Sequence, residues 1–327
     1  METMAVNKLC TAFLAGALAA GCAFVAQAQT YPTKLVRIIV PFPAGGTADV
    51  LPRIVGEKLA AKWGQPVIVE NRPGAGGNIG AEAVARAEPD GYTLLSSPPG
   101  PLAINHNLYE KLAFDPAKFV PVTVLATVPN VLAARTGLPA RSVRELIDYA
   151  KANAGKVTYA SQGSGSTSHL TANLFQLMAK VQMLHVPYKG TAPALTDLMG
   201  GQVDIFFDNL ASSLKQHQSG RIRILAVASG KRAAVLPEVP TVAEAALPGF
   251  LSVTWFGVVA PPGTPEAIAR QIGAAITEAI RLPDVQKRFL DQGADPVGNT
   301  PAEMAAFVKD EMARWREVIV AANVKAN

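Results

Sequence analysis

Short apolar runs alternate along this chain with longer segments of helical periodicity. The runs are LVRIIV 35–40, PVIVE 66–70, YTLLSS 92–97, KVTYAS 156–161, MLHVPY 183–188, VDIFFD 203–208, IRILAVAS 222–229 and SVTWFGVVAP 252–261. Buried parallel strands read as continuous apolar runs of this length, and their alternation with helices is typical of doubly wound sheets. The pattern therefore predicts an α/β fold built on parallel sheets.

Helix starts are predicted between and after these runs. Three sites have the spacing of a capping box, in which Ser or Thr precedes Glu by three positions: Ser142/Glu145, Thr241/Glu244 and Thr300/Glu303. Pro265 and Pro301 suit the first turn of a helix, where the backbone N–H has no intrahelical partner.

Two glycine-rich loops each leave an apolar run and open a helical segment, VPFPAGGTAD at 40–49 and YASQGSGSTSHL at 159–170. Such a junction directs backbone N–H groups and the positive end of a helix dipole at one point, which predicts an anion site. Neither loop contains Lys or Arg, but both supply hydroxyl groups. Phosphates usually recruit cations, whereas amides and hydroxyls suffice for a carboxylate. We therefore expect two loops that face a shared cleft and hold a carboxylate.

Residues 1–28 have the pattern of a secretory signal peptide, in which Lys8 precedes an apolar run and Ala-Gln-Ala ends at Ala28. Cleavage there gives a mature chain that starts at Gln29. A loose lipobox at 19–22 offers an alternative, with Cys22 as the lipidated residue.

Composition narrows the class of protein. Both cysteines, Cys10 and Cys22, lie in the presequence, so the mature chain would have no disulfide. The net charge of +5 comes from scattered basic residues, and an aromatic content of 6% disfavours a nucleic-acid groove. Beyond the presequence no stretch reaches the roughly 18 apolar residues of a membrane span. These features predict a soluble periplasmic protein of two domains.

The order of several blocks resembles the tripartite tricarboxylate transporter substrate-binding proteins, the TctC or Bug family. The blocks are PFPAGGTAD (41–49), NRPGAGGNIG (71–80), EPDGYTLL (88–95), SQGSGSTSHL (161–170), HVPYKGTAPALTDLMGGQVDIFF (185–207), LPEVPTVAEA (236–245) and WFGVVAPPGTP (255–265). They extend over almost the whole mature chain, and as a set they are specific.

The resemblance implies a type II periplasmic binding-protein fold with two α/β domains joined by two crossing hinge strands. Domain 1 would comprise 29–127 plus 251–327, and domain 2 would comprise 128–250. The hinge would run through 125–134 and 252–261. The implied partners are a small carboxylate and the membrane subunits of a tripartite transporter in a Gram-negative bacterium, with the receptor itself a monomer.

The resemblance also implies which residues hold the ligand, through amides, hydroxyls and ordered waters. Those of the first loop are Phe42, Ala44, Gly45, Gly46 and Thr47. Those of the second loop are Ser161, Gly163, Ser164, Gly165, Ser166 and Thr167.

Further candidates each have a structural alternative. Asp49 either lines the site or caps the helix that follows, and the cap is favoured. Asp208, at the end of an apolar run, either accepts hydrogen bonds from the ligand or is a turn residue. His169 is a site candidate or a hydrogen-bonded structural residue, and the histidine spacing predicts no metal. Arg72 and Lys189 are second-rank candidates for anion partners, because both adjoin turns, where a solvated charge or a structural ion pair is the more common role.

Other functional classes fit less well. A serine hydrolase would use Ser164 or Ser166 with His169 and a nearby Asp, but neither serine lies in G-x-S-x-G. Residues 163–168 lack the third glycine of G-x-G-x-x-G and no Walker lysine follows, so no cofactor is expected. A periplasmic sensor that signals through a membrane partner would need the same clamp and is the stronger alternative. The ligand stays open among citrate, C4-dicarboxylates, acidic amino acids and aromatic carboxylates.

Overall fold

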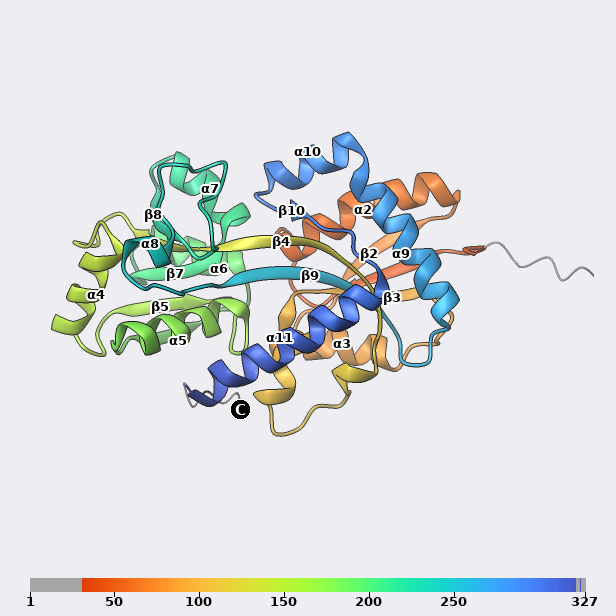
Figure 1. The fold of residues 1–327 in the computed structure, drawn as a ribbon, viewed down its shortest axis with the longest axis horizontal. Coiled ribbons are helices and arrows are strands. Elements are labelled where there is room, and N and C mark those ends of the chain that lie inside the picture. Colours follow the sequence, from red (N-terminus) through yellow and green to blue (C-terminus); the bar gives the residue numbers. More distant parts are fainter. Residues whose placement is uncertain (1–30, 322–323, 325–327) are drawn as a thin grey trace, which may run out of the picture. The chain divides into compact units, whose positions relative to one another are not determined.

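The computed structural model describes residues 31–321 and 324, and Lys34–Asn327 form one compact unit (Figure 1). The predicted signal peptide, with Cys10, Cys22 and the cleavage site at Ala28, lies outside the described residues.

The first part of the structure, which we call lobe 1, is built on three parallel strands. β1 (Val36–Val40) lies between β2 (Val67–Asn71) and β3 (Thr93–Ser97). The sheet continues from β3 through β9 (Val253–Ala260) to β4 (Val120–Arg135), and the two-residue β10 (Asp295–Pro296) pairs with β4.

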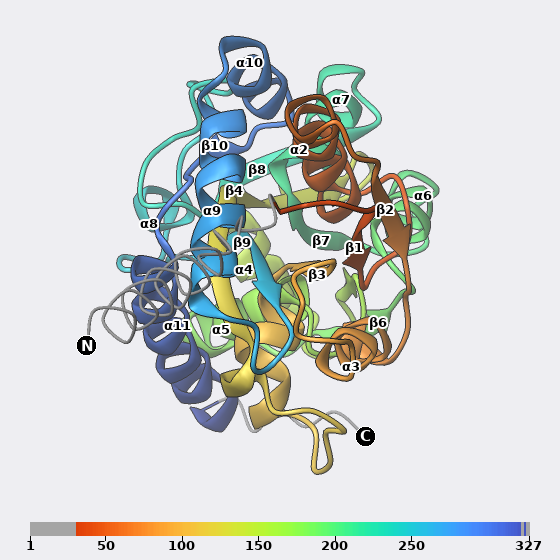
Figure 2. The same ribbon diagram turned by 90° about the vertical axis from the view of Figure 1, so that its right-hand side faces the viewer.

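Helices cover both faces of this sheet. On one face α2 (Thr47–Trp63), α9 (Glu266–Arg281) and α10 (Pro283–Asp291) contact one another (Figure 2). On the other face α3 (Asn78–Ala85) and α11 (Pro301–Ala321) pack on a core that includes Ile39, Leu95 and Trp255. Short helical turns η1 (Ala75–Gly77), η2 (Gly100–Ile104), η3 (Asn105–Asn107) and η4 (Pro116–Lys118) complete lobe 1.

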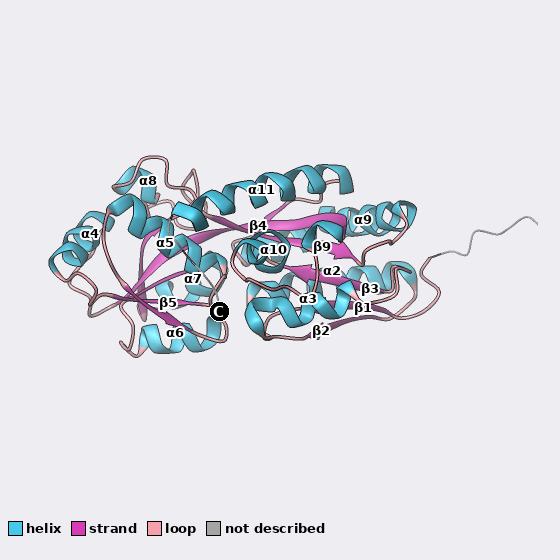
Figure 3. Cartoon of the chain, turned by 90° about the horizontal axis from the view of Figure 1, so that it is seen from below, coloured by secondary structure: helices cyan, strands magenta, loops and turns pink. Residues whose placement is uncertain are grey.

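Lobe 2 is built on the far half of β4. There β4 pairs with β7 (Ile205–Asn209) and β8 (Ile222–Val227), and β5 (Thr158–Ser161) and β6 (Leu184–Pro187) extend the sheet from β7. α4 (Val143–Ala152), α5 (Thr167–Ala179) and α8 (Val242–Ala245) cover one face, and α6 (Thr191–Met199) and α7 (Leu210–Gln218) cover the other (Figure 3).

β4 and β9 link the two lobes and run side by side between them (Figure 1). The pairing of β4 changes from β9 to β7 and β8 next to Pro129. Both linking strands are antiparallel to their neighbours, so the sheets are mixed, and the expectation of parallel sheets holds only for β1–β3 and β5–β7. The predicted boundary at 127/128 falls inside β4 and that at 250/251 falls just before β9. These boundaries stay predictions.

A buried polar cluster lies where β4 and β9 pass from one lobe to the other. Asn130 donates from Nδ2 to Ser252 Oγ at 3.0 Å and to Thr171 Oγ1 at 3.3 Å, and its Oδ1 accepts from Thr254 at 2.9 Å. Every one of these side chains is nearly or fully buried, so the crossing is held by hydrogen bonds rather than by apolar packing alone.

Helices start close to each predicted position, with Pro301 as the first residue of α11 and Pro265 one position before α9, as its N-cap rather than in its first turn. Thr241 and Glu244 form a complete capping box at α8, and Thr300 and Glu303 exchange the same two bonds at α11. Ser142 caps α4 by accepting from the amide of Glu145, whose side chain accepts from the amide before Ser142 rather than from Ser142 itself.

Candidate functional site

The first glycine-rich loop joins β1 to α2 and is held by a buried carboxylate. Asp49 lies in the first turn of α2, where Oδ2 accepts from the amide of Gly45 at 3.1 Å. Its Oδ1 accepts from Arg53 Nε and Asn71 Nδ2, both at 2.9 Å. Burial opposes ionisation, but these three hydrogen bonds outweigh it and hold the pKa of Asp49 below its usual value. Asp49 thus shapes the loop, with Gly46 rather than Asp49 as the N-cap, and its contact with a ligand stays a prediction.

The start of α2 keeps its hydrogen-bond donors free of protein partners. The helix has no side-chain cap, and within residues 31–321 the amides of Gly46, Thr47 and Ala48 have no acceptor. Thr47 Oγ1 is also buried without a partner in this part of the chain. Buried donors without partners are costly, and an anion at a helix N-terminus satisfies them.

A small cavity of about 60 Å³ lies in front of these donors, between the two lobes. Its lining from lobe 1 and β9 consists of Phe42, Pro43, Ala44, Gly46, Thr47, Ala48, Pro98, Thr254 and Phe256. Its lining from lobe 2 consists of Gln162, Lys189, Gly190, Thr191, Ala192, Pro193 and Asn209. Four of the five residues predicted from the first loop are therefore in the lining, and the fifth, Gly45, lines the hollow next to it.

The facing wall comes from a third loop, residues 188–190, which joins β6 to α6. Gly190 has a φ of +133°, and α6 begins at Thr191 without a side-chain cap. A Cβ built on Gly46 would lie 3.9 Å from Thr191 Oγ1, so the starts of α2 and α6 face each other closely. Lys189 in this loop is exposed, lines the cavity and has no ion pair within the described chain. Two helix N-termini and an ammonium group make this cavity electropositive.

This third loop is not among the binding elements that the sequence predicts. Its signal was present, because MLHVPY is followed by Lys-Gly-Thr and a helical segment, the same strand-turn-helix order as in the two predicted loops. For Lys189 the sequence favours a solvated charge or a structural ion pair over a role as an anion partner.

The polar groups of the second glycine-rich loop, between β5 and α5, form hydrogen bonds mainly within the loop and with the first turn of α5. The amide of Gly163 donates to Ser161 Oγ at 3.2 Å, and the amide of Gly165 donates to His169 Nδ1 at 3.2 Å. Ser166 Oγ donates to the carbonyl of Gly163 at 2.6 Å and also caps α5. Only Gln162 of this loop lines the cavity, and it was not among the predicted ligand residues. The ligand-binding role of the other loop residues stays a prediction.

The same loop contacts lobe 1. A Cβ on Gly165, whose φ is +80°, would lie 3.0 Å from Leu108 Cδ1 and 3.1 Å from Asn105 Oδ1. One on Gly76 would lie 3.2 Å from the carbonyl of Ser164. The second loop therefore touches lobe 1 beside η1 and η3, and glycine is what allows so close an approach. The amides of Ser164 and Thr167 have no acceptor among the residues described here.

Three aromatic rings stack beneath the second loop. The centroids of His169 and His185 are 4.1 Å apart, and Tyr159 stacks on His185 at 4.8 Å. His185 Nε2 lies 2.7 Å from Ser161 Oγ, which is completely buried. Burial lowers the pKa of His169 to about 3 and that of His185 to about 4, so both rings are neutral near pH 7. The stack supports the loop from below, and a contact of His169 with the ligand stays a prediction.

Asp208 lies behind the cavity wall, at the end of β7. It is fully buried and accepts from Ser213 Oγ at 2.8 Å and from Gln162 Nε2 at 3.0 Å. Burial raises the pKa of Asp208 to about 7, although its hydrogen bonds oppose this shift. The structure therefore places Asp208 behind Gln162 rather than in the cavity lining, and its direct contact with a ligand stays a prediction.

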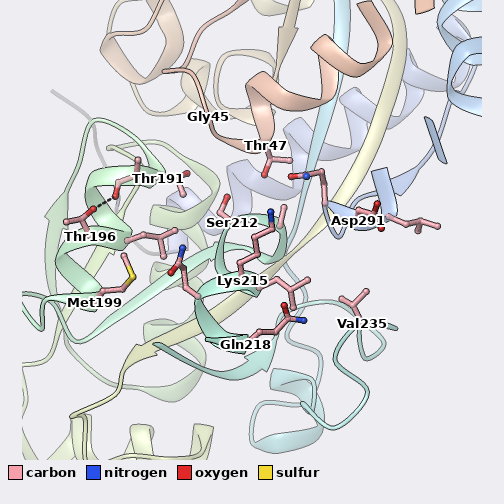
Figure 4. A pocket seen from close by; sticks show the side chains of 17 residues that line it. Gly45, Thr47, Thr191, Thr196, Met199, Ser212, Lys215, Gln218, Val235 and Asp291 are labelled. Atoms are coloured by element: carbon pink, nitrogen blue, oxygen red, sulfur yellow. Dashed lines mark hydrogen bonds between the residues drawn. The ribbon is translucent and has the colours of Figure 1, made fainter. Parts of the chain in front are cut away.

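A larger hollow of about 690 Å³ adjoins the cavity and shares Thr47, Thr191 and Ala192 with it (Figure 4). Its walls come from α6, α7, the segment around Val235 and the end of α10. In Figure 4 the side chain of Lys215 extends from α7 toward Thr47. The hollow gives a ligand room to extend from the cavity toward solvent.

No group of three or more His, Cys, Asp or Glu side chains among the described residues is arranged to hold a metal ion. Across the same residues, no helix combines the length and the apolar character needed to span a bilayer.

Comparison with known proteins adds to this geometry. A model described as tripartite tricarboxylate transporter family receptor, TctC, matches residues 51–324. Protein BugT of Bordetella pertussis is 41% identical over 302 residues, which are 92% of this chain and 93% of BugT.

Solved structures are similar over nearly the same length. R. palustris Rpa4515 with adipate has a TM-score of 0.87 at 40% identity and covers 90% of this chain and 99% of its own. The periplasmic binding protein BugD has a TM-score of 0.85 at 36% identity, with coverage of 91% and 100%. MatC of Rhodopseudomonas palustris with bound malate has a TM-score of 0.84 at 36% identity, with coverage of 88% and 100%. These likenesses confirm the predicted type II periplasmic binding-protein fold.

Proposed function

The chain belongs to the tripartite tricarboxylate transporter receptor family, and we propose that it captures a small carboxylate between its lobes and delivers it to the membrane subunits of such a transporter. Two relatives of similar structure hold adipate and malate, and both of these ligands carry two carboxylates. The proposal assigns this chain the same chemical class of ligand.

One observation carries the assignment of the site. The uncapped N-termini of α2 and α6 come from different lobes and face one cavity, with Thr47 Oγ1 unpartnered and Lys189 at the edge. A carboxylate there would accept from the amides of Thr47 and Ala48 on one side and from Thr191 on the other. It would therefore hold the two lobes together.

The size of the cavity sets the position of the ligand. About 60 Å³ is far below the roughly 300 Å³ or more of a typical ligand pocket, so it accommodates one carboxylate rather than a whole dicarboxylate. The rest of the ligand extends into the adjoining hollow, where Lys215 faces it, or the lobes separate to admit it. The predicted second-loop residues then act as the contact that closes the lobes.

We further propose that the protein binds without turnover. Within the described part of the chain, Ser161 and His185 form a hydroxyl–imidazole pair, but Ser161 is completely buried and already accepts from the amide of Gly163. Ser166 donates to the carbonyl of Gly163 and is likewise engaged. A hydrolase would need an exposed, activated hydroxyl.

The experiment is mass spectrometry of ligand released from freshly purified, denatured protein, followed by a thermal-shift screen of adipate, malate, citrate, acidic amino acids and aromatic acids. A bound acid at about 100 times its Kd stabilises the native state by about 2.7 kcal/mol. Failure of every acid to shift the melting temperature would contradict the proposal. Turnover of matched esters that is abolished by Ser166→Ala or His169→Ala would support an enzyme instead.

The proposed location is the periplasm, as for the relatives named as periplasmic binding proteins. We expect the exported chain to start at Gln29. Intact-mass analysis measures this directly, and a lipid-modified chain that starts at Cys22 would contradict it.

A further inference from the structure

The cavity presents hydrogen-bond donors on most of its polar wall. The amides at the start of α2, the hydroxyl of Thr47 and the ammonium group of Lys189 all offer hydrogen to a ligand. A carboxylate, which only accepts, satisfies such a wall completely. Gln162 and Asn209 are lining residues whose side-chain amides contain both a donor and an acceptor. Of these two, Gln162 has an amide whose orientation is set by hydrogen bonds to other described residues, so it presents a fixed group to a ligand.

Two hydrogen bonds fix the orientation of the Gln162 amide. Nε2 lies 3.0 Å from Asp208 Oδ1 and 3.0 Å from Thr191 Oγ1. A primary amide nitrogen carries two hydrogens, and these two contacts use both. Oε1 of Gln162 has no donor within the described part of the chain.

The reverse orientation is unfavourable because of the second partner of Asp208. Ser213 Oγ donates to Asp208 Oδ2 at 2.8 Å, so the carboxylate already directs its other oxygen at a donor. A flipped Gln162 would set its carbonyl oxygen against Asp208 Oδ1, which places two acceptors together in a completely buried site. Asp208 therefore acts as a positioning residue for Gln162.

Thr191 is oriented by the same contact. Its Oγ1 accepts from Gln162, so its own hydrogen is free to donate, and the oxygen lies close to the start of α2. Thr191 thus joins the donors that surround a carboxylate.

We infer that Gln162 selects carboxylates that carry a hydroxyl or amino group near the bound carboxylate, because its Oε1 is held in the cavity wall as an acceptor. This inference rests on the proposed carboxylate-binding function and narrows its ligand class to hydroxy acids and amino acids. A simple dicarboxylate fills the donors equally well but leaves Oε1 without a partner.

The test compares acids that differ by one group: succinate with malate and aspartate, glutarate with 2-hydroxyglutarate and glutamate, and adipate with 2-aminoadipate. Affinities are measured by calorimetry at about pH 8.5, above the pKa of about 7 that burial gives Asp208. We expect the substituted member of at least one pair to bind about tenfold more tightly than the plain acid, as a hydrogen bond to an otherwise unpaired buried group allows.

Variants then test whether Gln162 causes the preference for the substituted acid. Gln162→Met keeps the length of the side chain and removes the acceptor, so the ratio of the affinities for the substituted and the plain acid should fall to less than about threefold. The release of Thr191 weakens both acids alike and leaves this ratio unchanged. Asp208→Asn frees Gln162 to turn and should reduce the preference in the same direction. Gln202→Met, at an exposed glutamine of lobe 2, is the matched control and should leave the preference unchanged.

Each outcome is decisive. If wild-type protein binds plain and substituted acids equally, the inference is overturned and the proposed function stands. If Gln162→Met weakens both members of a pair by the same factor, Gln162 supports the cavity without selecting the ligand, and the inference is again overturned. If no acid binds, the proposed function itself fails. Circular dichroism and the unfolding midpoint establish that each variant is folded, and the Asp208→Asn ratio provides the readout if Gln162→Met is not.

Discussion

Gly165 provides a direct test of whether contact between the lobes supports binding. Its φ of +80° is strained for any residue with a Cβ, so Gly165→Ala should lower the free energy of unfolding by about 1–2 kcal/mol. The new Cβ would also lie 3.0 Å from Leu108 Cδ1 and 3.1 Å from Asn105 Oδ1. Those atoms belong to lobe 1 and must shift by a few tenths of an ångström.

A matched control separates the two effects. Gly155 has a φ of +72°, and a Cβ there would meet nothing within 4 Å, so Gly155→Ala adds the strain without the contact. Both variants should lose similar stability. Only Gly165→Ala should also penalise the closed arrangement, because its overpacking, at about 1–3 kcal/mol, arises when the lobes touch.

The assay follows from that difference. Denaturant unfolding gives the stability of each variant, and calorimetry gives its affinity for the acid that stabilises the wild type most. An extra cost of about 1.4 kcal/mol in the closed state weakens binding about tenfold. We expect this loss for Gly165→Ala and less than a twofold change for Gly155→Ala. A folded Gly165→Ala protein with near wild-type affinity, or an equal loss in Gly155→Ala, would refute the reasoning.

Three further predictions concern single side chains. Glu311→Ala should lower the free energy of unfolding by about 3 kcal/mol, because Glu311 Oε2 accepts hydrogen bonds from the buried indoles of Trp255 and Trp315. A loss below about 1 kcal/mol, measured by unfolding in guanidinium chloride, would contradict this. Burial raises the pKa of Asp208 to about 7 in the folded protein, against an ordinary 3.8, so its contribution to stability falls as the pH rises between these values. Relative to wild type, the free energy of unfolding of Asp208→Asn should therefore rise by about 1.4 kcal/mol per pH unit from about pH 4.5 to 6.5. Parallel stability curves for the two proteins would contradict this. Lys189→Met should weaken dicarboxylate binding by no more than about fivefold, because Lys189 is exposed. The variant should also make the dicarboxylate affinity less dependent on salt concentration, and an unchanged salt dependence would exclude Lys189 from the site.

The sequence predicted most of the strands because each is a short apolar run between turn residues. All eight runs form strands. β4 is not among these runs: the family resemblance implied only a hinge through 125–134, and proline at position 129 ordinarily interrupts a ladder, yet the strand extends from Val120 to Arg135. The antiparallel direction of β4 and β9 also has no local signal, because direction depends on which strands meet in space.

The site was predicted less completely, because the sequence locates a loop but does not show which of its side chains face the cavity. The first loop was found through its glycines, and its residues do line the cavity. Gln162 lies in the second loop but was passed over for the hydroxyl residues around it. Gln162 bonds to Asp208, which is 46 residues away in the chain and also accepts from Ser213 of α7, so no local pattern reveals this arrangement.

The position of β9 has a consequence for the order in which the protein can assemble during synthesis. β9 lies between β3 and β4 in the sheet, although its residues follow all of lobe 2 in the chain. A growing chain that ends before Val253 therefore has both neighbours of the gap but not the strand that fills it. The sheet of lobe 1 can be completed only when most of the polypeptide has been made.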